Sequence, residues 1–337
     1  MQKMILKKLM KLQKMIVTNK DLSEFNSLQI AVNTKYYIEC KTDSDIEEAF
    51  KFLKKNKIKF LILGEGTNVV FTKPYDGLII KNSFKKEKKI NKNKVKVSSG
   101  YNWDRFVRFC IKNSLYGLEN LSGIPGTVGA GPIQNIGAYG EEISDYIEYI
   151  EVFNLKTGNV EILNNMNCNF DYRDSLFKKH KHLFIKNVFF KLKEKFIANN
   201  SYQDLQDYRY KKASELRQRI LRIRNQKLEN YLTKPNVGSF FKNPLINKKD
   251  LKKLLSEEAD LKFYKHDALI KVSAAWLIER CNLKGMKFNK ARVSKKHSLV
   301  LINEDKSPNS ILKLKNKVKT TVSKKYNISL EEEPTII

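Results

Sequence analysis

The glycines of this chain are unevenly distributed, and that distribution constrains its fold more than any other feature. Seven of the 14 glycines in 337 residues lie in one segment, residues 117–140, GLENLSGIPGTVGAGPIQNIGAYG. Glycine lacks a Cβ and adopts positive φ readily, so such a run lets several backbone N–H groups turn toward one anion. Pro125 and Pro132 stiffen the segment, and Gln134 and Asn135 add amide donors. The segment is predicted to bind an anionic group such as a cofactor pyrophosphate; a tight loop without a ligand is the alternative.

A second donor-rich loop follows the apolar run at residues 60–63, in the sequence GEGTNVVF. Its candidate ligand-binding residues are Gly64, Gly66, Thr67 and Asn68. Val69 occupies the position where the dinucleotide fingerprint GxGxxG requires its third glycine, so the match to a Rossmann fold is weak. A different phosphate-binding loop is expected.

Length and cysteine content restrict the class of protein. A chain of 337 residues with 41% apolar residues is expected to form two or three domains. The four cysteines are far apart and form no CxxC pair, which argues against a zinc site, a redox dithiol or a disulfide framework and fits a reducing cytoplasm. No metal site and no transmembrane segment are predicted. Residues 1–20 place apolar side chains on one face of a helix and are expected to be a basic extension.

The net charge of +29 raises the possibility of nucleic-acid binding. The excess of Lys and Arg is spread along the whole chain, however, and no RNA-binding motif or helix-turn-helix pattern is present. Its densest run, residues 85–96, is predicted to be a solvated loop that enters a strand at residues 95–99. The charge is better explained by attraction of multiply anionic small molecules, such as nucleotide sugars and nicotinamide dinucleotide phosphates.

Hydrophobic periodicity predicts strands and helices in both parts of the chain. Strands are expected at residues 30–39, 60–63, 146–154, 160–163, 184–192 and 298–303. Helices are expected at residues 43–56, with Thr42 or Ser44 as cap, and at 103–113, 204–229, 249–257, 273–281 and 310–326. The helix at 204–229 is expected to have Lys, Arg and Gln on its outer face. A proline-marked boundary is expected at Lys234-Pro235.

Six motifs in order give the chain a family resemblance. They are GEGTNVVF, SGIPGTVGAGPIQNIGAYG, YRDS, VGSFFKNP, AAWLIERCNLKG and HSLVLINE. Together they closely resemble the UDP-N-acetylenolpyruvoylglucosamine reductases of bacterial peptidoglycan synthesis, over nearly everything after Asn26. The resemblance implies an α+β fold: a two-lobed FAD-binding domain of the PCMH or vanillyl-alcohol-oxidase type and a C-terminal α+β substrate-binding domain. The expected segments are an extension (1–22), two FAD-binding lobes (23–85 and 86–230), the substrate domain (231–326) and a C-terminal segment returning to the active site (327–337).

The resemblance also assigns the two glycine-rich loops to FAD. The residues implied to bind it are Gly64, Gly66, Thr67, Asn68, Ser122, Gly123, Ile124, Pro125, Gly126, Gly129, Gln134, Asn135, Gly137, Ala138 and Tyr139. Some flavoproteins of this wider fold attach the flavin covalently through histidine. Here all four histidines follow the FAD loops in sequence, so FAD is predicted to be non-covalent.

The implied reaction uses NADPH to reduce FAD, and hydride then passes to C3 of the enolpyruvyl ether, leaving negative charge at C2 and on the carboxylate. Arg173 of YRDS is implied to bind that carboxylate; by itself it would be interpreted as a surface salt bridge to Asp171 or Asp174. Ser239 of VGSFFKNP is implied to protonate C2; by itself it would be a turn residue. Glu333 of LEEEP is implied to assist this protonation or to polarise the carboxylate. The alternatives are that the assisting glutamate lies one or two residues away, or that these glutamates form a solvated acidic tail.

Substrate contacts are implied for four residues. They are Tyr202 on a mobile loop typical of the subtype called type I, Lys227 and Asn243 at the UDP diphosphate, and Lys271. The expected partners are UDP-N-acetylglucosamine enolpyruvate and NADPH. No nucleic acid, no stable membrane association, a monomeric state and a cytoplasmic location are expected. Two other classes stay open at this point: an FAD oxidoreductase of the same fold acting on an alcohol, and a charge-driven nucleic-acid-binding protein.

Overall fold

The structure, a computed structural model, describes residues 16–337, and its contacts divide the chain into two compact units. Of the described residues, unit 1 comprises those up to Asp21, Asn33–Glu65 and Pro74–Arg224, and unit 2 comprises Leu22–Val32, Gly66–Lys73 and Asn225–Ile337. Both units are discontinuous in sequence. The division of the chain into five segments given above stays a prediction.

The first sheet of unit 1 has the strand order β1-β2-β5-β3. Its strands are β1 (Val17–Asp21), β2 (Asn33–Cys40), β5 (Tyr75–Asn82) and β3 (Phe60–Leu63). β1 pairs antiparallel with β2, whereas β2 and β3 both pair parallel with β5. The expectation of a helix at residues 1–20 is therefore wrong for Val17–Lys20, because β2 offers these residues an edge to pair with; residues 1–15 lie outside the described part.

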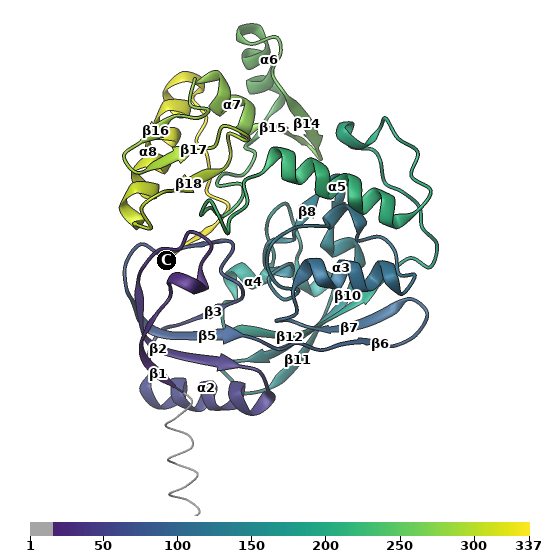
Figure 1. The fold of residues 1–337 in the computed structure, drawn as a ribbon, viewed down its shortest axis with the longest axis vertical. Helices are drawn as coiled ribbons and strands as arrows, with labels where there is room; N and C mark the ends of the chain where they lie inside the picture. The colour runs from purple at the N-terminus through teal and green to yellow at the C-terminus, as the bar shows by residue number, and fades with distance from the viewer. Residues whose placement is uncertain (1–15) are drawn as a thin grey trace, which may run out of the picture. The chain divides into compact units, whose positions relative to one another are not determined.

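Helix α2 (Asp43–Asn56) packs on this first sheet (Figure 1). Thr42 is its N-cap and forms a capping box with Asp45, which satisfies amides at the helix start. Its buried residues Ile46, Ala49 and Leu53 join Ile38 in one apolar cluster. The predicted bounds of this helix and of β3 are confirmed.

The second sheet of unit 1 is antiparallel, with the order β11-β10-β12-β7-β6. Its strands are β6 (Glu87–Lys89), β7 (Lys94–Ser98), β10 (Ile147–Asn154), β11 (Val160–Asn164) and β12 (Leu183–Lys191). Strand β6 lies inside the run predicted to be a loop, because pairing with β7 organises these charged residues as an edge strand.

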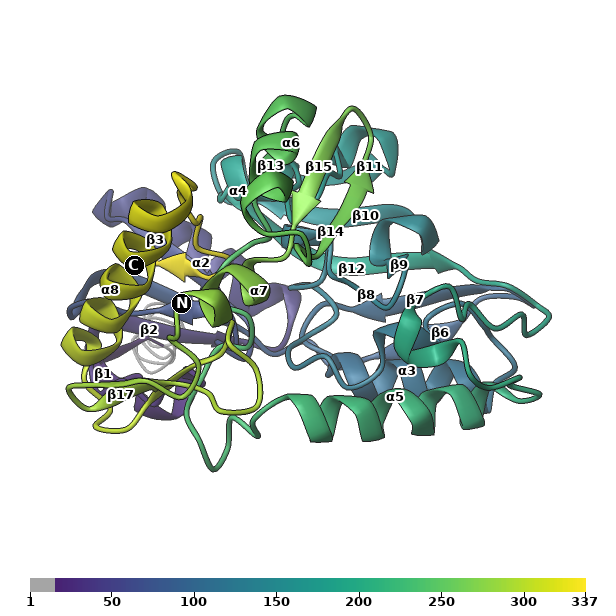
Figure 2. The same cartoon turned by 90° about the horizontal axis from the view of Figure 1, so that it is seen from above.

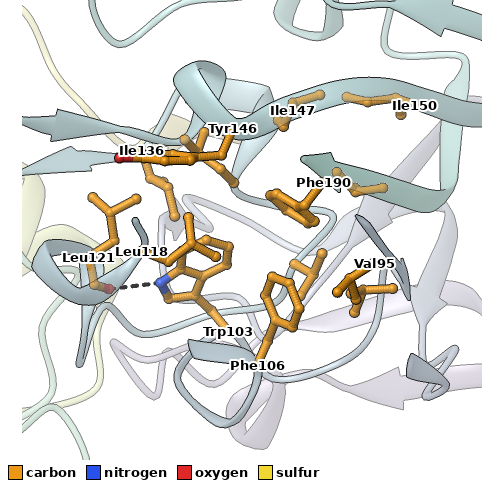
Figure 3. Packing of buried hydrophobic residues seen from close by; sticks show 14 of the residues in the cluster. Val95, Trp103, Phe106, Leu118, Leu121, Ile136, Tyr146, Ile147, Ile150 and Phe190 are labelled. Atoms are coloured by element: carbon orange, nitrogen blue, oxygen red, sulfur yellow. Dashed lines mark hydrogen bonds between the residues drawn. The ribbon is translucent and has the colours of Figure 1, made fainter. Parts of the chain in front are cut away.

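Helix α3 (Trp103–Lys112) packs on this sheet through the largest apolar cluster of the unit. Figure 3 shows Trp103 and Phe106 of α3 against Phe190 of β12, with the Trp103 indole N–H donating to the carbonyl of Leu121 at 2.8 Å. This bond fixes the first part of the glycine-rich segment. The core of unit 1 therefore supports one end of the predicted cofactor-binding segment.

Helix α5 (Ala213–Lys227) is shorter than the predicted helix 204–229. Residues 203–205 form a single 3₁₀ turn, η6, and the following residues are irregular. The Glu215 carboxylate accepts hydrogen bonds from the amides of Lys211 and Lys212, which caps α5 at its observed start. The sequence alone concealed this because Leu205 continues the apolar spacing of the helix.

The remaining elements of unit 1 are short. They are the hairpin β8 (Gly137–Ala138) and β9 (Glu141–Glu142), helix α4 (Leu176–Lys179), and the 3₁₀ turns η2 (Glu119–Leu121), η3 (Pro132–Gln134), η4 (Ile143–Tyr146) and η5 (Met166–Cys168).

Unit 2 contains two three-stranded sheets and a two-stranded parallel pair. The first sheet joins β13 (Leu245–Ile246), β15 (Leu269–Val272) and β14 (Phe263–His266), and the second joins β16 (Lys287–Phe288), β17 (Ala291–Val293) and β18 (Leu301–Asn303). The helices are α6 (Lys248–Glu257), α7 (Ala274–Arg280) and α8 (Pro308–Tyr326), with the 3₁₀ turn η1 (Ser23–Phe25). The parallel pair is β4 (Val69–Val70) with β19 (Thr335–Ile336).

Three chemical observations accompany the fold. All four cysteines are free thiols. Within residues 16–337 no group of three His, Cys, Asp or Glu side chains is placed to hold a metal ion. In the same residues no helix is both long and apolar enough to cross a membrane.

Candidate functional site

The glycine-rich segment of unit 1 has a strongly irregular backbone. Six residues in it adopt positive φ: Gly117, Gly123, Gly126, Asn135, Tyr139 and Gly140. Gly126 has a φ of 120°, which L side chains rarely adopt. At Gly129 the requirement is space, since an added Cβ would lie 2.4 Å from the Cβ of Ser99. The segment therefore needs bare backbone for conformation at one position and for close packing at another.

Two arginines of α5 and one aspartate of α3 hold this segment, and the sequence did not identify them. Asp104 Oδ1 accepts a hydrogen bond from the Gly123 amide at 2.6 Å, and the Asp104 carboxylate forms a bidentate pair with Arg217 at 2.7 Å for each bond. The Arg224 Nε donates to the Gly123 carbonyl at 3.2 Å. Helices α5 and α3 lie side by side in both views (Figures 1 and 2).

The expectation that the arginines of this helix face outward is therefore wrong for Arg217 and Arg224. The Arg217 side chain is 11% exposed. Burial lowers the pKa of the Arg224 guanidinium, and the neighbouring Tyr139 and Asp104 oppose that shift. A sequence signal for this pair was available. Arg217 and Arg224 are seven residues apart, which places them on one face of a helix, in a chain whose charge is mostly lysine.

Arg173 is anchored to the glycine-rich segment. Its guanidinium donates to the carbonyls of Gly137 at 2.7 Å and Asn135 at 3.4 Å. It lies at the tip of a turn closed by two backbone hydrogen bonds between Asp171 and Asp174, with φ of 53°. The guanidinium carbon also lies 5.4 Å from the centre of the Tyr172 ring. The structure thus places Arg173 beside the predicted cofactor-binding segment.

Tyr202 also lies beside this segment. Its ring, 38% exposed for the residue, meets the ring of Tyr139 edge-on with centroids 5.3 Å apart. Asn120, buried at 2% exposure, donates to the carbonyls of Tyr139 at 2.7 Å and Asn199 at 2.9 Å. One buried amide therefore connects the glycine-rich segment to the loop that carries Tyr202.

The other predicted residues of the segment have mixed environments. Ser122 is fully buried, and its hydroxyl donates to the Glu119 carbonyl at 2.6 Å. The Asn135 side chain donates to Glu142 at 2.6 Å and accepts from the Ser144 amide at 3.2 Å. Ile124, Pro125, Gln134 and Ala138 all belong to this stretch of unit 1. Ser122 and Asn135 thus shape the loop through their side chains.

The donor-rich loop with the sequence GEGTNVVF, residues 64–71, is divided between the units. Gly64 belongs to unit 1, where an added Cβ would lie 3.0 Å from the Thr127 hydroxyl. Gly66, Thr67 and Asn68 belong to unit 2. The Gly66 backbone presses so closely on Phe25 that an added Cβ would lie 2.0 Å from the Phe25 carbonyl oxygen. Glycine at position 66 is thus required by chain packing, whatever ligand the loop binds.

The structure brings Ser239 and Glu333 to one place in unit 2. Ser239 pairs with Val300, and the Phe240 amide donates to Leu299 at 2.8 Å. The Phe240 carbonyl accepts the Glu333 amide at 2.9 Å, so this short extended segment changes partner at Phe240. Phe240 therefore links the two residues: Ser239 precedes it in the chain, and Glu333 is hydrogen-bonded to its carbonyl.

The three successive glutamates differ in their partners. Glu331 pairs with Lys242 at 2.8 Å and its side chain is 71% exposed. Glu332 pairs with Lys315 at 3.1 Å and Lys319 at 3.0 Å. Burial tends to raise the pKa of Glu332, but the hydrogen bonds from Lys319 and Lys315 outweigh it and hold the pKa below its ordinary value. These lysines occupy the carboxylates of Glu331 and Glu332.

The three predicted diphosphate-side residues also lie in unit 2. Lys227, exposed, ends α5 and lies near His297, whose pKa is lowered first by burial and further by Lys227. Asn243 accepts the Ala274 amide at 2.9 Å, which positions its amide next to the start of α7. Lys271 is half-buried in β15, between Leu245 and Tyr264 on the neighbouring strands.

These residues fit a flavin dinucleotide in conformation and in space. Positive φ at six positions of the segment provides the turns that expose N–H groups to phosphate oxygens. Next to Ser239, an added Cβ on Gly238 would meet nothing within 4 Å, so open space adjoins the predicted proton donor.

Comparisons with known proteins cover both units. A family model described as "FAD binding domain" matches residues 34–164, and one described as "UDP-N-acetylenolpyruvoylglucosamine reductase, C-terminal domain" matches residues 228–337. The reductase of that name from Buchnera aphidicola subsp. Baizongia pistaciae is 38% identical over 94% of this chain and 98% of its own length. That from Pseudoalteromonas translucida is 39% identical over 83% of this chain and 86% of its own.

A solved structure supports the fold. UDP-N-acetylenolpyruvylglucosamine reductase from Thermus caldophilus has a TM-score of 0.67 at 20% identity, covering 95% of this chain and 97% of that one. The predicted α+β class and FAD-binding domain are confirmed. On sequence identity over nearly the full length, the chain belongs to the family of UDP-N-acetylenolpyruvoylglucosamine reductases.

Proposed function

We propose that the protein reduces UDP-N-acetylglucosamine enolpyruvate to UDP-N-acetylmuramate in peptidoglycan precursor synthesis, with NADPH as hydride donor and non-covalent FAD as cofactor. One observation carries the proposal: a relative with the reductase name matches 94% of this chain and 98% of its own length. A match confined to the FAD-binding domain would have left the substrate open.

FAD, when bound, supplies hydride transfer between NADPH and the enolpyruvyl substrate. The residues that would hold it in unit 1 are those of the segment from Ser122 to Tyr139, together with Gly64. Gly66, Thr67 and Asn68 of unit 2 are proposed to hold it as well. Asp104, Arg217 and Arg224 support the segment, because all three are linked to it through Gly123 or Tyr139.

Arg173 is proposed to bind the substrate carboxylate and to stabilise the charge that develops on it. Its permanent charge and planar donor fork suit a carboxylate. Its bonds to the carbonyls of Gly137 and Asn135 leave the guanidinium fixed in direction before substrate arrives. Such preorganisation reduces the reorganisation needed in the transition state.

Ser239 is proposed to deliver a proton to C2, with Glu333 assisting. A serine hydroxyl is a weak acid, so it needs a neighbouring group that replaces the proton or orients the hydroxyl. Glu333 is bonded through its amide to the Phe240 carbonyl at 2.9 Å, and Phe240 directly follows Ser239 in the chain. This is the reason for choosing Glu333 among the three glutamates.

Substrate binding is proposed for Lys227 and Asn243 at the diphosphate, for Lys271, and for Tyr202 as part of a closing loop. The UDP group carries negative charge, and two of the four residues are cations. The net charge of +29 would attract such a ligand from a distance. We propose further that the protein acts as a monomer in the cytoplasm, without nucleic acid and without stable membrane association.

The proposed function is tested by NADPH oxidation with purified protein. NADPH consumption that depends strictly on the enolpyruvyl nucleotide, with a yellow flavin released on denaturation, supports it. Flavin that is reduced by an alcohol in the absence of NADPH contradicts it in favour of another flavin oxidoreductase. Colourless protein that binds no FAD contradicts it altogether, and colour retained on the unfolded chain contradicts non-covalent attachment.

A further inference from the structure

The last residues of the described chain form a strand that connects two parts of unit 2 far apart in sequence. Strand β19 runs parallel to β4, with the Thr335 amide donating to the Asn68 carbonyl at 3.0 Å and the Ile337 amide donating to Val70 at 2.9 Å. Thr72 completes the pairing: its amide and its hydroxyl donate to the Ile337 carbonyl at 2.8 Å and 2.7 Å. Four hydrogen bonds therefore fasten residues 335–337 to residues 68–72.

The same segment is also hydrogen-bonded to the extended segment Ser239–Lys242, called here the Ser239 strand. Just before β19, the Glu333 amide donates to Phe240 at 2.9 Å, and the Lys242 amide donates to Glu331 at 2.9 Å. Pro334 between the two sets of bonds is buried and has a restricted φ. Residues 331–337 thus join the predicted flavin loop to the predicted proton-donating residues without an intervening flexible stretch.

The loop itself depends on this attachment. On its other side Gly66 is packed against Phe25, and the Gly66 carbonyl accepts the Ser27 amide at 3.1 Å. The loop is therefore held on one side by Phe25 and Ser27 and on the other side by β19. Although the loop precedes a strand of unit 1 in sequence, its contacts place residues 66–73 in unit 2.

We propose that β19 is a positioning strand: it holds the Gly66–Thr72 loop in a flavin-binding conformation and ties that conformation to the placement of Ser239 and Glu333. The proposal rests on the proposed function for the identity of the flavin. Because binding linkage is reciprocal, FAD bound at the loop must stabilise β19 and Glu333 to the same extent that β19 strengthens FAD binding.

The test uses Thr335, whose side chain is exposed, so that only the backbone is changed. Thr335→Pro removes the amide that donates to Asn68, and Thr335→Ala is the matched control that keeps it. Loss of this bond is expected to raise the Kd for FAD about 5- to 10-fold in the full-length protein, with the alanine variant within about twofold of the parent. Hydrogen exchange without flavin is expected to speed up in residues 66–72 and at Phe240–Lys242 in the proline variant only.

A second pair of variants keeps the test valid if the proline variant misfolds. Thr72→Val removes one hydroxyl bond to Ile337, and Thr321→Val removes a comparable bond on α8, from Thr321 to Lys317 at 2.8 Å. Only the first is expected to weaken FAD binding. In the parent protein, added FAD should also slow exchange of the Glu333, Thr335 and Ile337 amides, a response that a merely structural strand would not give.

Equal FAD affinity and equal exchange in Thr335→Pro and Thr335→Ala would overturn the proposal, as would FAD that leaves exchange in residues 333–337 unchanged. A parent protein that binds no FAD would instead overturn the proposed function. The exchange comparison without flavin would then still decide whether β19 joins the loop to the Ser239 strand.

Discussion

Replacement of Asp104 by asparagine should destabilise unit 1 by removing the charge that holds Arg217. Asp104 Oδ1 accepts from the Gly123 amide at 2.6 Å, and both carboxylate oxygens accept from Arg217 at 2.7 Å. Asparagine has nearly the same shape and keeps one acceptor oxygen. Its NH₂ group, however, faces either the Gly123 amide or the guanidinium, and neither can accept its protons.

The size of the effect follows from exposure. Ion pairs in full contact with solvent contribute about 0.2–1 kcal/mol, whereas removing one partner of a fully buried pair costs about 3–5 kcal/mol. Here the side chains of Asp104 and Arg217 are 31% and 11% exposed. We therefore expect Asp104→Asn to lower the free energy of unfolding of unit 1 by about 2 kcal/mol at pH 7.5, with most of it recovered in the double variant with Arg217→Gln.

The chain offers a selective fluorescence assay because it has two tryptophans, one in each unit. In a Trp276→Phe background, the remaining Trp103 is 1% exposed and adjoins Asp104. Urea unfolding followed by Trp103 fluorescence then reports the stability of unit 1. Asp76→Asn is the control, since its pair with Lys35 is 79% and 56% exposed, and it should change stability by less than about 0.5 kcal/mol.

The pH dependence gives a second check. Burial tends to raise the pKa of Asp104, but the bonds from Arg217 and Gly123 outweigh it and lower the pKa below its ordinary value. A depressed carboxyl pKa contributes stability above the unfolded pKa of about 4, and that stability is lost as pH falls through the folded pKa. The difference in unfolding free energy between the parent and Asp104→Asn should therefore be constant from pH 8 to 5 and become smaller below about pH 4. A loss under about 0.5 kcal/mol, or a gap unchanged at pH 3, would refute this reasoning.

Three further predictions concern individual side chains. Ser239→Ala should leave flavin reduction by NADPH unchanged in stopped flow but slow reoxidation by the enolpyruvyl nucleotide by about 10² to 10⁴, with part of the rate restored by Ser239→Cys; equal slowing of both steps would make the serine structural. Tyr202→Ala should raise the KM for the nucleotide, whereas Tyr208→Ala on the same loop is the control. Because the Tyr202 ring contacts Tyr139, FAD affinity must be measured as well; a change in FAD affinity alone would assign the Tyr202 ring to the cofactor. Burial raises the pKa of Glu119, whose Oε1 has no partner among the described residues, so the folded state disfavours its charge and loses stability as pH rises above about 4. Glu119→Gln should remove that loss, with a stability gain in urea at pH 7.5 that disappears near pH 4; a gain that does not depend on pH would contradict the raised pKa.

Local elements could be predicted from the sequence where the signal is itself local. The helix at 43–56 and the strand at 60–63 have their predicted bounds because a capping residue, an amphipathic spacing and a short apolar run all act within a few residues. The helix at 204–229 was predicted too long for the same reason. Its apolar spacing continues through Leu205. Only the hydrogen bonds that the Glu215 carboxylate accepts from the Lys211 and Lys212 amides show where α5 begins.

The motifs likewise determined the family and the predicted site residues, because short family motifs such as YRDS and GSFFKNP are recognised in the sequence without knowledge of the fold. They did not show what supports those residues. Asp104, Arg217 and Arg224 carry no motif, and their role appears only when α5 packs on α3 beside Gly123.

What the sequence determined by itself is therefore the class of fold, the family and the loops built from bare backbone. What only the tertiary structure decided is how distant segments combine: Thr72 bonds to Ile337 across 265 residues, Glu333 lies beside the Ser239 strand, and residues 66–73 belong to unit 2 rather than to the unit of Gly64. The physical reason is that backbone pairing between remote strands uses the same N–H and C=O groups at every residue, so no residue type marks which partner will be chosen.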